Sequence, residues 1–163
     1  AHVRAACPGA ELWLAGAEVS ISAADLEAKA RALGLGGAVH VLGHVGRIRD
    51  FYRSCHVGVV ASLGSEAVSR AAVEWMASAR PLVATKAGCL PETVLDGKTG
   101  MLVEPGDAEA LAAALIPLVR DAAARDVMGK AARKRYEECY RTDRFAADTI
   151  KLYQDALHHI PHR

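Results

Sequence analysis

The sequence has few aromatic residues, almost no net charge and no long apolar run. Aromatic residues make up 5% of the 163 residues, while hydrophobic residues make up 52%. We therefore expect a core of Ala, Val and Leu rather than of stacked rings, which is typical of an α/β domain. The chain carries 20 Lys and Arg against 19 Asp and Glu, and this balance gives no electrostatic reason to expect nucleic acid as a partner.

The sequence also lacks close cysteine pairs, a signal peptide and a membrane-spanning segment. Its four cysteines include no Cys-x-x-Cys pair, so we expect reduced thiols and a cytoplasmic location. The longest apolar stretches fall far short of the roughly 18 residues that a membrane-spanning helix needs. His40 and His44 lie four apart on a predicted strand and its turn, where they do not share one face, and no metal site is expected. The chain begins without Met, and we expect a fragment of a longer protein.

Short apolar runs alternate with helical patterns along the first two thirds of the chain. The predicted strands cover 11–16, 38–43, 57–62, 81–85 and 100–104, and the predicted helices cover 22–35, 47–55, the stretch from 65 to 81, a segment that Asp107 caps, 125–140 and 143–158. Pro117 is expected to kink or shorten the helix that contains it. The alternation predicts an α/β fold with a Rossmann-like parallel sheet flanked by helices. Ligands of such sheets bind beyond the carboxyl ends of the strands.

The stretch SEAVSRAAVEWMASARP (65–81) carries two glutamates eight positions apart. On one continuous helix, Glu66, Arg70 and Glu74 are successive i, i+4 neighbours on one face. The opposite face then forms the core, with Val68, Ala72, Trp75, Met76 and Ala79. Spacing alone favours a solvent-exposed Glu–Arg–Glu ladder over a ligand site, but it does not decide between them.

The position of this stretch favours a ligand. Glu66 closely follows the predicted strand 57–62, and the small residues between them form a turn that opens a helix. Free amide groups and the helix dipole stabilise an anion such as a diphosphate at that end. Glu74 lies about 12 Å further along a helix that rises 1.5 Å per residue, where its carboxylate can accept two ribose hydroxyls.

At this point the sequence resembles the retaining, nucleotide-sugar-dependent glycosyltransferases of the GT-B architecture, often called glycosyltransferase group 1. The resemblance covers about residues 8 to 116. Its motifs are the E-x7-E pair, RPLVAT at 80–85, PE at 91–92, DGKTG at 96–100 and PGDAEAL at 105–111. The ordered set is far more specific than the glutamate pair alone.

The resemblance implies a donor site for a nucleotide-diphosphate sugar. It places Glu66 as the catalytic residue near the donor sugar, and Glu74 on the ribose hydroxyls. The remaining donor-binding residues that it implies are Ala67, Val68, Ser69 and Arg70 at the diphosphate, and His44, Val45 and Arg47 at the base. The reaction implied is glycosyl transfer with retained anomeric configuration, without a cofactor and without a metal.

The chain departs from the family pattern around the first glutamate. The family usually has Gly-Phe-Gly after it, whereas Ala67, Val68 and Ser69 stand here, followed by Arg70. Our hypothesis is that the Ser69 hydroxyl and the Arg70 guanidinium replace the glycine approach to the phosphates. Ala79 and Cys89 stand where the family commonly has Gly, and His56 stands where it commonly has Asp.

The resemblance also implies missing parts. Residues 1–163 are expected to form a single donor-binding domain that lacks its first strand, while the acceptor (a glycan, a lipid or a small molecule) binds to an absent N-terminal domain. The helical segment 143–163 would pack on that domain, so the fragment alone is expected to be inactive and to self-associate through the exposed surface. The full-length protein could also lie peripherally at the inner face of the membrane.

The sequence leaves two other functions open. One is a nucleotide-binding or scaffolding module on the same fold without catalysis. The other is a dinucleotide-dependent oxidoreductase domain, which the sequence disfavours because no predicted strand is followed by G-x-G-x-x-G.

Overall fold

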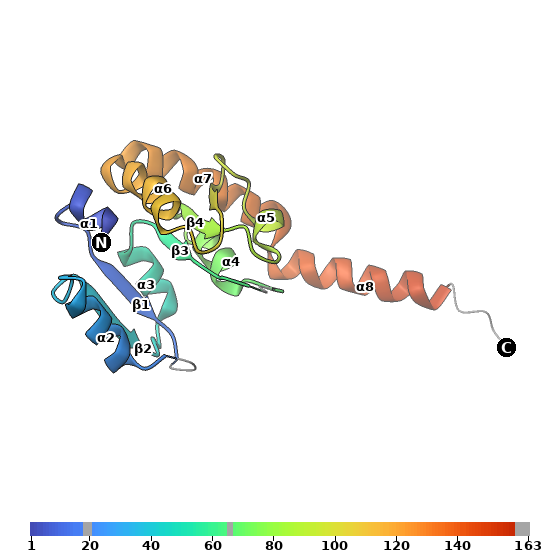
Figure 1. Cartoon of the computed structure of the whole chain (residues 1–163). Helices are drawn as coiled ribbons and strands as arrows, with labels where there is room; N and C mark the ends of the chain where they lie inside the picture. The colour runs from blue at the N-terminus through green and yellow to red at the C-terminus, as the bar shows by residue number, and fades with distance from the viewer. Residues whose placement is uncertain (18–20, 65–66, 159–163) are drawn as a thin grey trace.

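The computed structural model describes residues 1–17, 21–64 and 67–158 of the chain (Figure 1). Its strands are β1 (Leu12–Ala15), β2 (Val39–Gly43), β3 (Gly58–Val60), β4 (Leu82–Thr85) and β5 (Gly100–Val103). Its helices are α1 (His2–Ala6), α2 (Ala23–Ala32), α3 (Ile48–Ser54), α4 (Arg70–Ala77), α5 (Leu90–Thr93), α6 (Ala108–Arg120), α7 (Ala122–Cys139) and α8 (Thr142–His158). All five predicted strands are therefore present within about two residues of their predicted bounds.

The strands form two parallel sheets rather than the single sheet that the alternation predicts. One sheet has the order β1–β2 and the other β3–β4–β5, and every strand pair is parallel. Within the described residues, β1 and β3 each pair along one edge only. Leu12 and Trp13 on β1 are 45% and 43% exposed, as expected for a strand whose other edge is unpaired among the described residues.

Strand β4 lies at the centre of the core. All four of its residues are buried, and successive side chains point to opposite faces of the sheet. Leu82 and Ala84 pack against α3, α4 and α5, whereas Val83 packs with Val103, Ala114 and Leu118 against α6. The parallel sheet is thus covered by helices on both faces, as the α/β pattern predicts.

The buried core consists mostly of Ala, Val and Leu, as predicted, but aromatic rings gather on the first of these faces. Tyr52 packs edge-on against Trp75 with their ring centroids 4.6 Å apart, and Phe51 lies beside both rings. Aromatic residues are few in this chain, but three of the eight gather at one place. The composition could not show this clustering because it contains no information on position.

Side-chain caps fix the start of several helices. The Ser22 hydroxyl accepts from the Asp25 amide at the start of α2, and the Asp107 carboxylate accepts from the Ala110 amide at 2.8 Å, which confirms the predicted cap of α6. Asp121 caps α7 in the same way. Pro117 does not end α6, which continues through it to Arg120.

Helix α8 extends away from the body of the protein (Figure 1). Its apolar side chains are more than half exposed, namely Phe145, Ile150, Leu152, Tyr153 and Leu157. They lie within one arc of the helix, while the charged residues lie on the other side. None of the helices in the described ranges is both long and apolar enough to cross a membrane.

Candidate functional site

The carboxyl ends of β3, β4 and β5 are tied together by polar contacts. At the end of β4, the Thr85 hydroxyl donates to the Ser62 carbonyl in the loop after β3 at 2.7 Å, and Thr85 is 3% exposed. The neighbouring Lys86 ammonium lies 2.7 Å from the Glu104 carboxylate after β5. Because parallel strands end at one edge of the sheet, these contacts hold the loops at the edge where α/β proteins bind ligands.

The loop after β3 leads into α4, which begins later than predicted. The helix starts at Arg70, while Ala67, Val68 and Ser69 are not helical. Ser69 is the N-cap: its side chain is 3% exposed and accepts from the Ala72 amide at 3.4 Å. The prediction of one continuous helix through 67–69 is therefore wrong, because the capping residue Ser69 lies outside the helix.

The predicted residues of this loop differ in accessibility. Ala67, Val68 and Arg70 are exposed, and Val68 is 78% exposed. Val68 and Ala79 therefore lie outside the core to which the helical spacing assigned them, whereas Ala72, Trp75 and Met76 are buried as predicted. Glu66 lies outside the described residues, and its catalytic role stays a prediction.

Ala79 takes a backbone conformation that favours glycine. Its φ is +54°, in the left-handed region, just after the end of α4. This conformation explains why a glycine would suit the position, as the family pattern suggests. The adjoining carbonyl of Ala79 lies against Gly129 of α7, where even one added carbon would meet it.

Glu74 is held by a tyrosine that the sequence analysis missed. The Tyr52 hydroxyl of α3 donates to Oε2 of Glu74 at 2.6 Å, and Tyr52 is 6% exposed whereas Glu74 is half-buried. Burial and the hydrogen bond to Glu74 raise the pKa of Tyr52 far above its usual value, so the phenol stays protonated and remains a donor. Among the described residues, Arg70 forms no ion pair with Glu74, so this half of the alternative Glu–Arg–Glu ladder is not formed, while Glu66 lies outside the described residues.

A helical pattern in the sequence could have indicated Tyr52. Ile48, Phe51, Tyr52 and Cys55 recur at helical spacing within 47–55, which places Tyr52 on the buried face. A buried tyrosine hydroxyl usually finds a hydrogen-bond partner. The identity of that partner, 22 residues along the chain, depends on the packing of α3 against α4.

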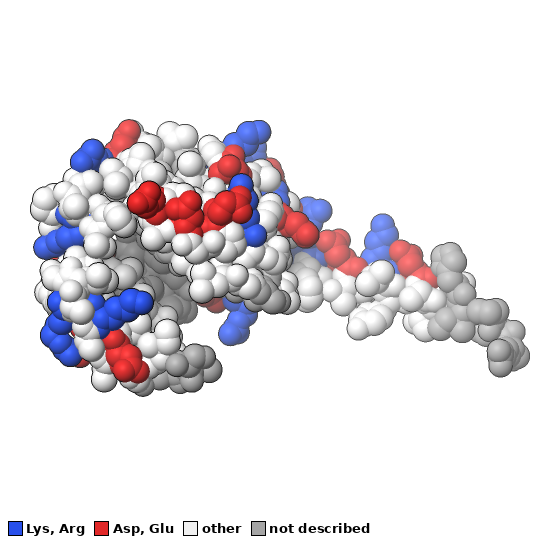
Figure 2. All heavy atoms as spheres, in the orientation of Figure 1, with Lys and Arg blue, Asp and Glu red and all other residues white. Residues whose placement is uncertain are grey.

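The predicted base-binding loop lies between β2 and α3. His44 and Arg47 are exposed, and Val45 is half-buried. A shallow hollow of about 360 Å³ opens beside them, lined by Gly46, Arg47, Ile48, Arg49, Asp50 and Arg53. Arg47 lies 3.8 Å from Asp50, so one carboxylate partly balances the three guanidinium groups. Over the face seen in Figure 2, basic and acidic side chains are interspersed.

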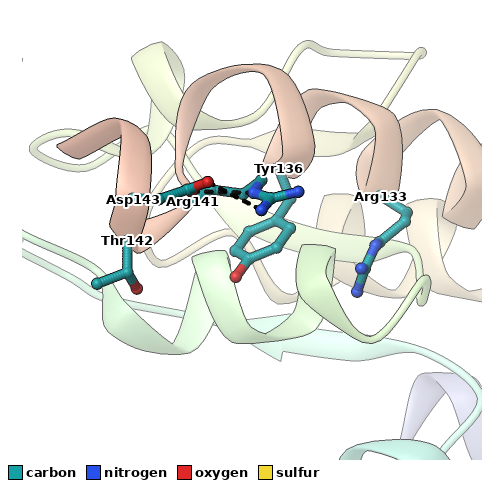
Figure 3. A pocket seen from close by; sticks show the side chains of 5 residues that line it. All are labelled: Arg133, Tyr136, Arg141, Thr142 and Asp143. Carbon is teal, nitrogen blue, oxygen red and sulfur yellow. Dashed lines mark hydrogen bonds and ion pairs between the residues drawn. The ribbon is translucent and has the colours of Figure 1, made fainter. Parts of the chain in front are cut away.

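A second hollow, of about 470 Å³, lies where α7 meets α8 (Figure 3). Arg141 forms two hydrogen bonds to Asp143, at 3.0 and 2.9 Å, and this pairing lowers the pKa of Asp143. Arg133 pairs with Glu137 and donates to the carbonyl of Ala77 at the end of α4. These contacts join α4, α7 and α8. Because both arginines that line the hollow are already paired, it offers no free cation to a ligand.

The described part of the chain contains no candidate metal site. No three His, Cys, Asp or Glu side chains of residues 1–17, 21–64 and 67–158 lie close enough together to hold a metal ion. The described part of the site consists of residues 67–70, of which all but the buried cap Ser69 are exposed, the Glu74 carboxylate with Tyr52 behind it, and the loop at 44–47.

Comparison with known proteins places this arrangement in a family. A family model described as "Glycosyl transferases group 1" matches residues 1–121. The chain belongs to this family. The group 1 match contains all the predicted site residues and ends at the start of α7.

Relatives and solved structures agree with the group 1 assignment. The chain is 34% identical over 134 residues to D-inositol 3-phosphate glycosyltransferase of Streptomyces avermitilis, covering 81% of this chain and 28% of that protein. It superposes on the C-terminal domain of a group 1 glycosyl transferase, LpcC, of Francisella tularensis with a TM-score of 0.66 and 30% identity, over 73% of this chain and 62% of that one. HepE of Anabaena, in complex with UDP, shares the fold with a TM-score of 0.87 and 24% identity, over 94% of this chain and 43% of that one.

These matches confirm the GT-B assignment of the fold. The group 1 chain spans about a quarter of the length of the Streptomyces relative, and the solved domain to which it is similar is a C-terminal one.

Proposed function

We propose that this chain is the donor-binding domain of a glycosyltransferase that uses a nucleotide-diphosphate sugar. The observation that carries the proposal is the Glu74 carboxylate, held half-buried on α4 next to the loop that leaves β3. In a chain of the group 1 family, that carboxylate is suited to accept the ribose hydroxyls of the donor. The complex of HepE with UDP supports a uridine nucleotide as the first ligand to test.

The diphosphate would lie against residues 67–70. The Arg70 guanidinium is exposed at the first turn of α4 and is free to approach a phosphate, whereas the Ser69 side chain already caps the helix. Glycosyl transfer breaks the bond between the anomeric carbon and the diphosphate oxygen, so negative charge grows on the leaving group. Amides and the Arg70 cation would stabilise that charge without a metal, with Glu66 beside the sugar and with retention of configuration.

The acceptor would bind to a domain outside these 163 residues. The unpaired edges of β1 and β3 support the proposal that one further strand completes the sheet between them. The exposed apolar arc of α8 supports packing on a second domain. Alone, the chain would then bind donor without transferring sugar, and its α8 surface would favour self-association, which light scattering measures.

The decisive experiment is a nucleotide titration followed by NMR, which detects millimolar affinity in a 17.2 kDa chain. UDP, GDP, ADP and NAD are added separately to the ¹⁵N-labelled protein. We expect one nucleoside diphosphate to shift amides of 44–47 and 67–74, and Glu74→Ala to abolish those shifts.

Control variants separate the roles of the site residues. Glu138→Ala removes an exposed glutamate of α7 and should leave binding unchanged, while Arg70→Ala should weaken diphosphates more than the nucleoside. A preference for NAD, or binding that survives Glu74→Ala, would overturn the proposal. Binding to none of the nucleotides would favour a scaffolding module.

A further inference from the structure

Tyr52 occupies a fixed position behind the candidate ribose site. Its ring is clamped by Trp75, which is itself 7% exposed, and by the partly buried Phe51. The ring lies in the same core cluster as Leu82 and Ala84 of the central strand. Only its hydroxyl reaches a polar group, and that group is the Glu74 carboxylate.

The contact between the two residues is short and directional. At 2.6 Å, it falls in the range of an O–H donor bound to an ionised carboxylate, a bond about twice as strong as one between neutral groups. A carboxylate offers about four lone-pair positions, so one bond to Oε2 leaves room for two ligand hydroxyls. No donor other than Tyr52 is seen on this carboxylate among the residues that the structure describes.

Without a donor to orient it, the Glu74 carboxylate would bind ribose hydroxyls weakly. A glutamate side chain has three rotatable bonds, and fixing it on binding costs conformational entropy. A donor anchored in the core fixes the carboxylate before the ligand arrives, which lowers that cost.

We propose that Tyr52 is a positioning residue of the nucleotide site, which orients the Glu74 carboxylate toward the 2′- and 3′-hydroxyls of the donor ribose. The inference rests on the proposed function, because it assigns Tyr52 a role only through Glu74. It goes further in naming the group that pre-organises the ribose contact. Tyr52 also lies on α3, the helix that follows the loop predicted to hold the base, so one residue connects both ends of the nucleoside site.

The test compares a ribonucleotide with its 2′,3′-dideoxy analogue on wild-type and Tyr52→Phe protein. The probes are UDP and 2′,3′-dideoxyuridine diphosphate, or the guanosine pair if GDP binds better. Tyr52→Phe keeps the ring against Trp75 and removes only the hydroxyl. We expect it to raise the Kd of the ribonucleotide about three- to tenfold and to leave the Kd of the dideoxy analogue within about twofold.

Two controls exclude a merely structural effect. Tyr136→Phe removes a hydroxyl from a half-buried tyrosine of α7 and should change neither Kd. Glu74→Ala is expected to lose nucleotide binding, so the coupling in that background is measured on the free energy of unfolding. Tyr52→Phe should cost less stability there than in wild type, because coupled residues are not additive. An ¹⁵N spectrum that matches wild type outside the site establishes that the variant is folded.

The outcomes are distinguishable from failure of the proposed function. If wild-type protein binds no nucleotide, the proposed function fails and this inference fails with it. If wild type prefers the ribonucleotide but Tyr52→Phe weakens both ligands equally, or weakens neither, this inference alone is overturned.

Discussion

Gly58 at the start of β3 offers the sharpest test of how the core supports the site. The residue is buried, and a Cβ placed on it would lie 2.6 Å from Cε2 of Trp75 and would also meet the Cδ2 atom of that ring. Carbon atoms do not approach so closely, so Gly58→Ala forces the indole to move. The indole is the ring against which Tyr52 packs, and its movement would reach the Glu74 carboxylate.

The expected loss of stability follows from two opposing effects. Overpacking a well-packed core costs about 1–3 kcal/mol, and replacing glycine by alanine regains about 0.4–1 kcal/mol through the unfolded state. We therefore expect a net loss of about 1–2 kcal/mol in the free energy of unfolding. For a chain of this length, that loss corresponds to a Tm lower by roughly 2–8 °C.

Urea denaturation followed by circular dichroism measures this loss, and a matched glycine provides the control. Gly37 has no atom within 4 Å of its added Cβ and no left-handed φ, so Gly37→Ala should stay within about 0.5 kcal/mol of wild type. In a Trp75→Leu background the clash disappears, and Gly58→Ala should no longer destabilise. A Gly58→Ala protein as stable as wild type, or one equally destabilised in both backgrounds, would refute the reasoning.

Two further predictions concern the end of α4 and the thiols. Ala79→Gly removes a left-handed alanine that costs about 1–2 kcal/mol and adds a glycine entropy cost of about 0.5–1 kcal/mol. Urea denaturation should therefore show a gain in the free energy of unfolding of up to about 1.5 kcal/mol, and a loss would contradict the assigned backbone. Burial raises the pKa of the Cys55 thiol above its usual 9.0, which leaves less reactive thiolate at pH 8. Mass spectrometry should therefore find iodoacetamide on the exposed Cys139 well before Cys55, and equal rates would contradict this prediction.

Most strands and helices were predictable because the interactions that form them join residues close together in the sequence. The strand at 82–85 is an apolar run of the kind that a parallel sheet buries. The Asp107 cap lies three residues from the amide that donates a hydrogen bond to it. The start of α4 could not be read in this way. The buried Ser69 caps the helix by accepting from the Ala72 amide, and the helical spacing of Glu66, Arg70 and Glu74 contains no information on that cap.

The sequence proposes residues for the site but does not predict their hydrogen-bond partners. The glutamate at 74 and the loops at 44–47 and 67–70 follow from the motif and its place after a strand. The bond from Tyr52 joins residues 22 positions apart, and it exists because Trp75 and Phe51 bring α3 against α4. The sequence motif indicates the Glu74 carboxylate, whereas the packing of the aromatic core determines that Tyr52 is its hydrogen-bond donor.

The late start of α4 changes how the two glutamates of the motif are related. On one helix, their separation would be fixed at about 1.5 Å per residue, and changes at 67–69 would alter only the surface. Because the helix begins at Arg70, the path of residues 67–69 sets where the chain before it runs relative to Glu74. The buried Ser69 holds the end of that path next to α4, and the bond from Thr85 to Ser62 holds the loop on the β3 side of residues 65–66, which lie outside the described ranges. With Glu66 beside the sugar as proposed, Ala67, Val68 and Ser69, which stand where the family usually has Gly-Phe-Gly, would act on the geometry between the sugar and ribose ends of the donor site, while Tyr52 would keep the ribose end fixed.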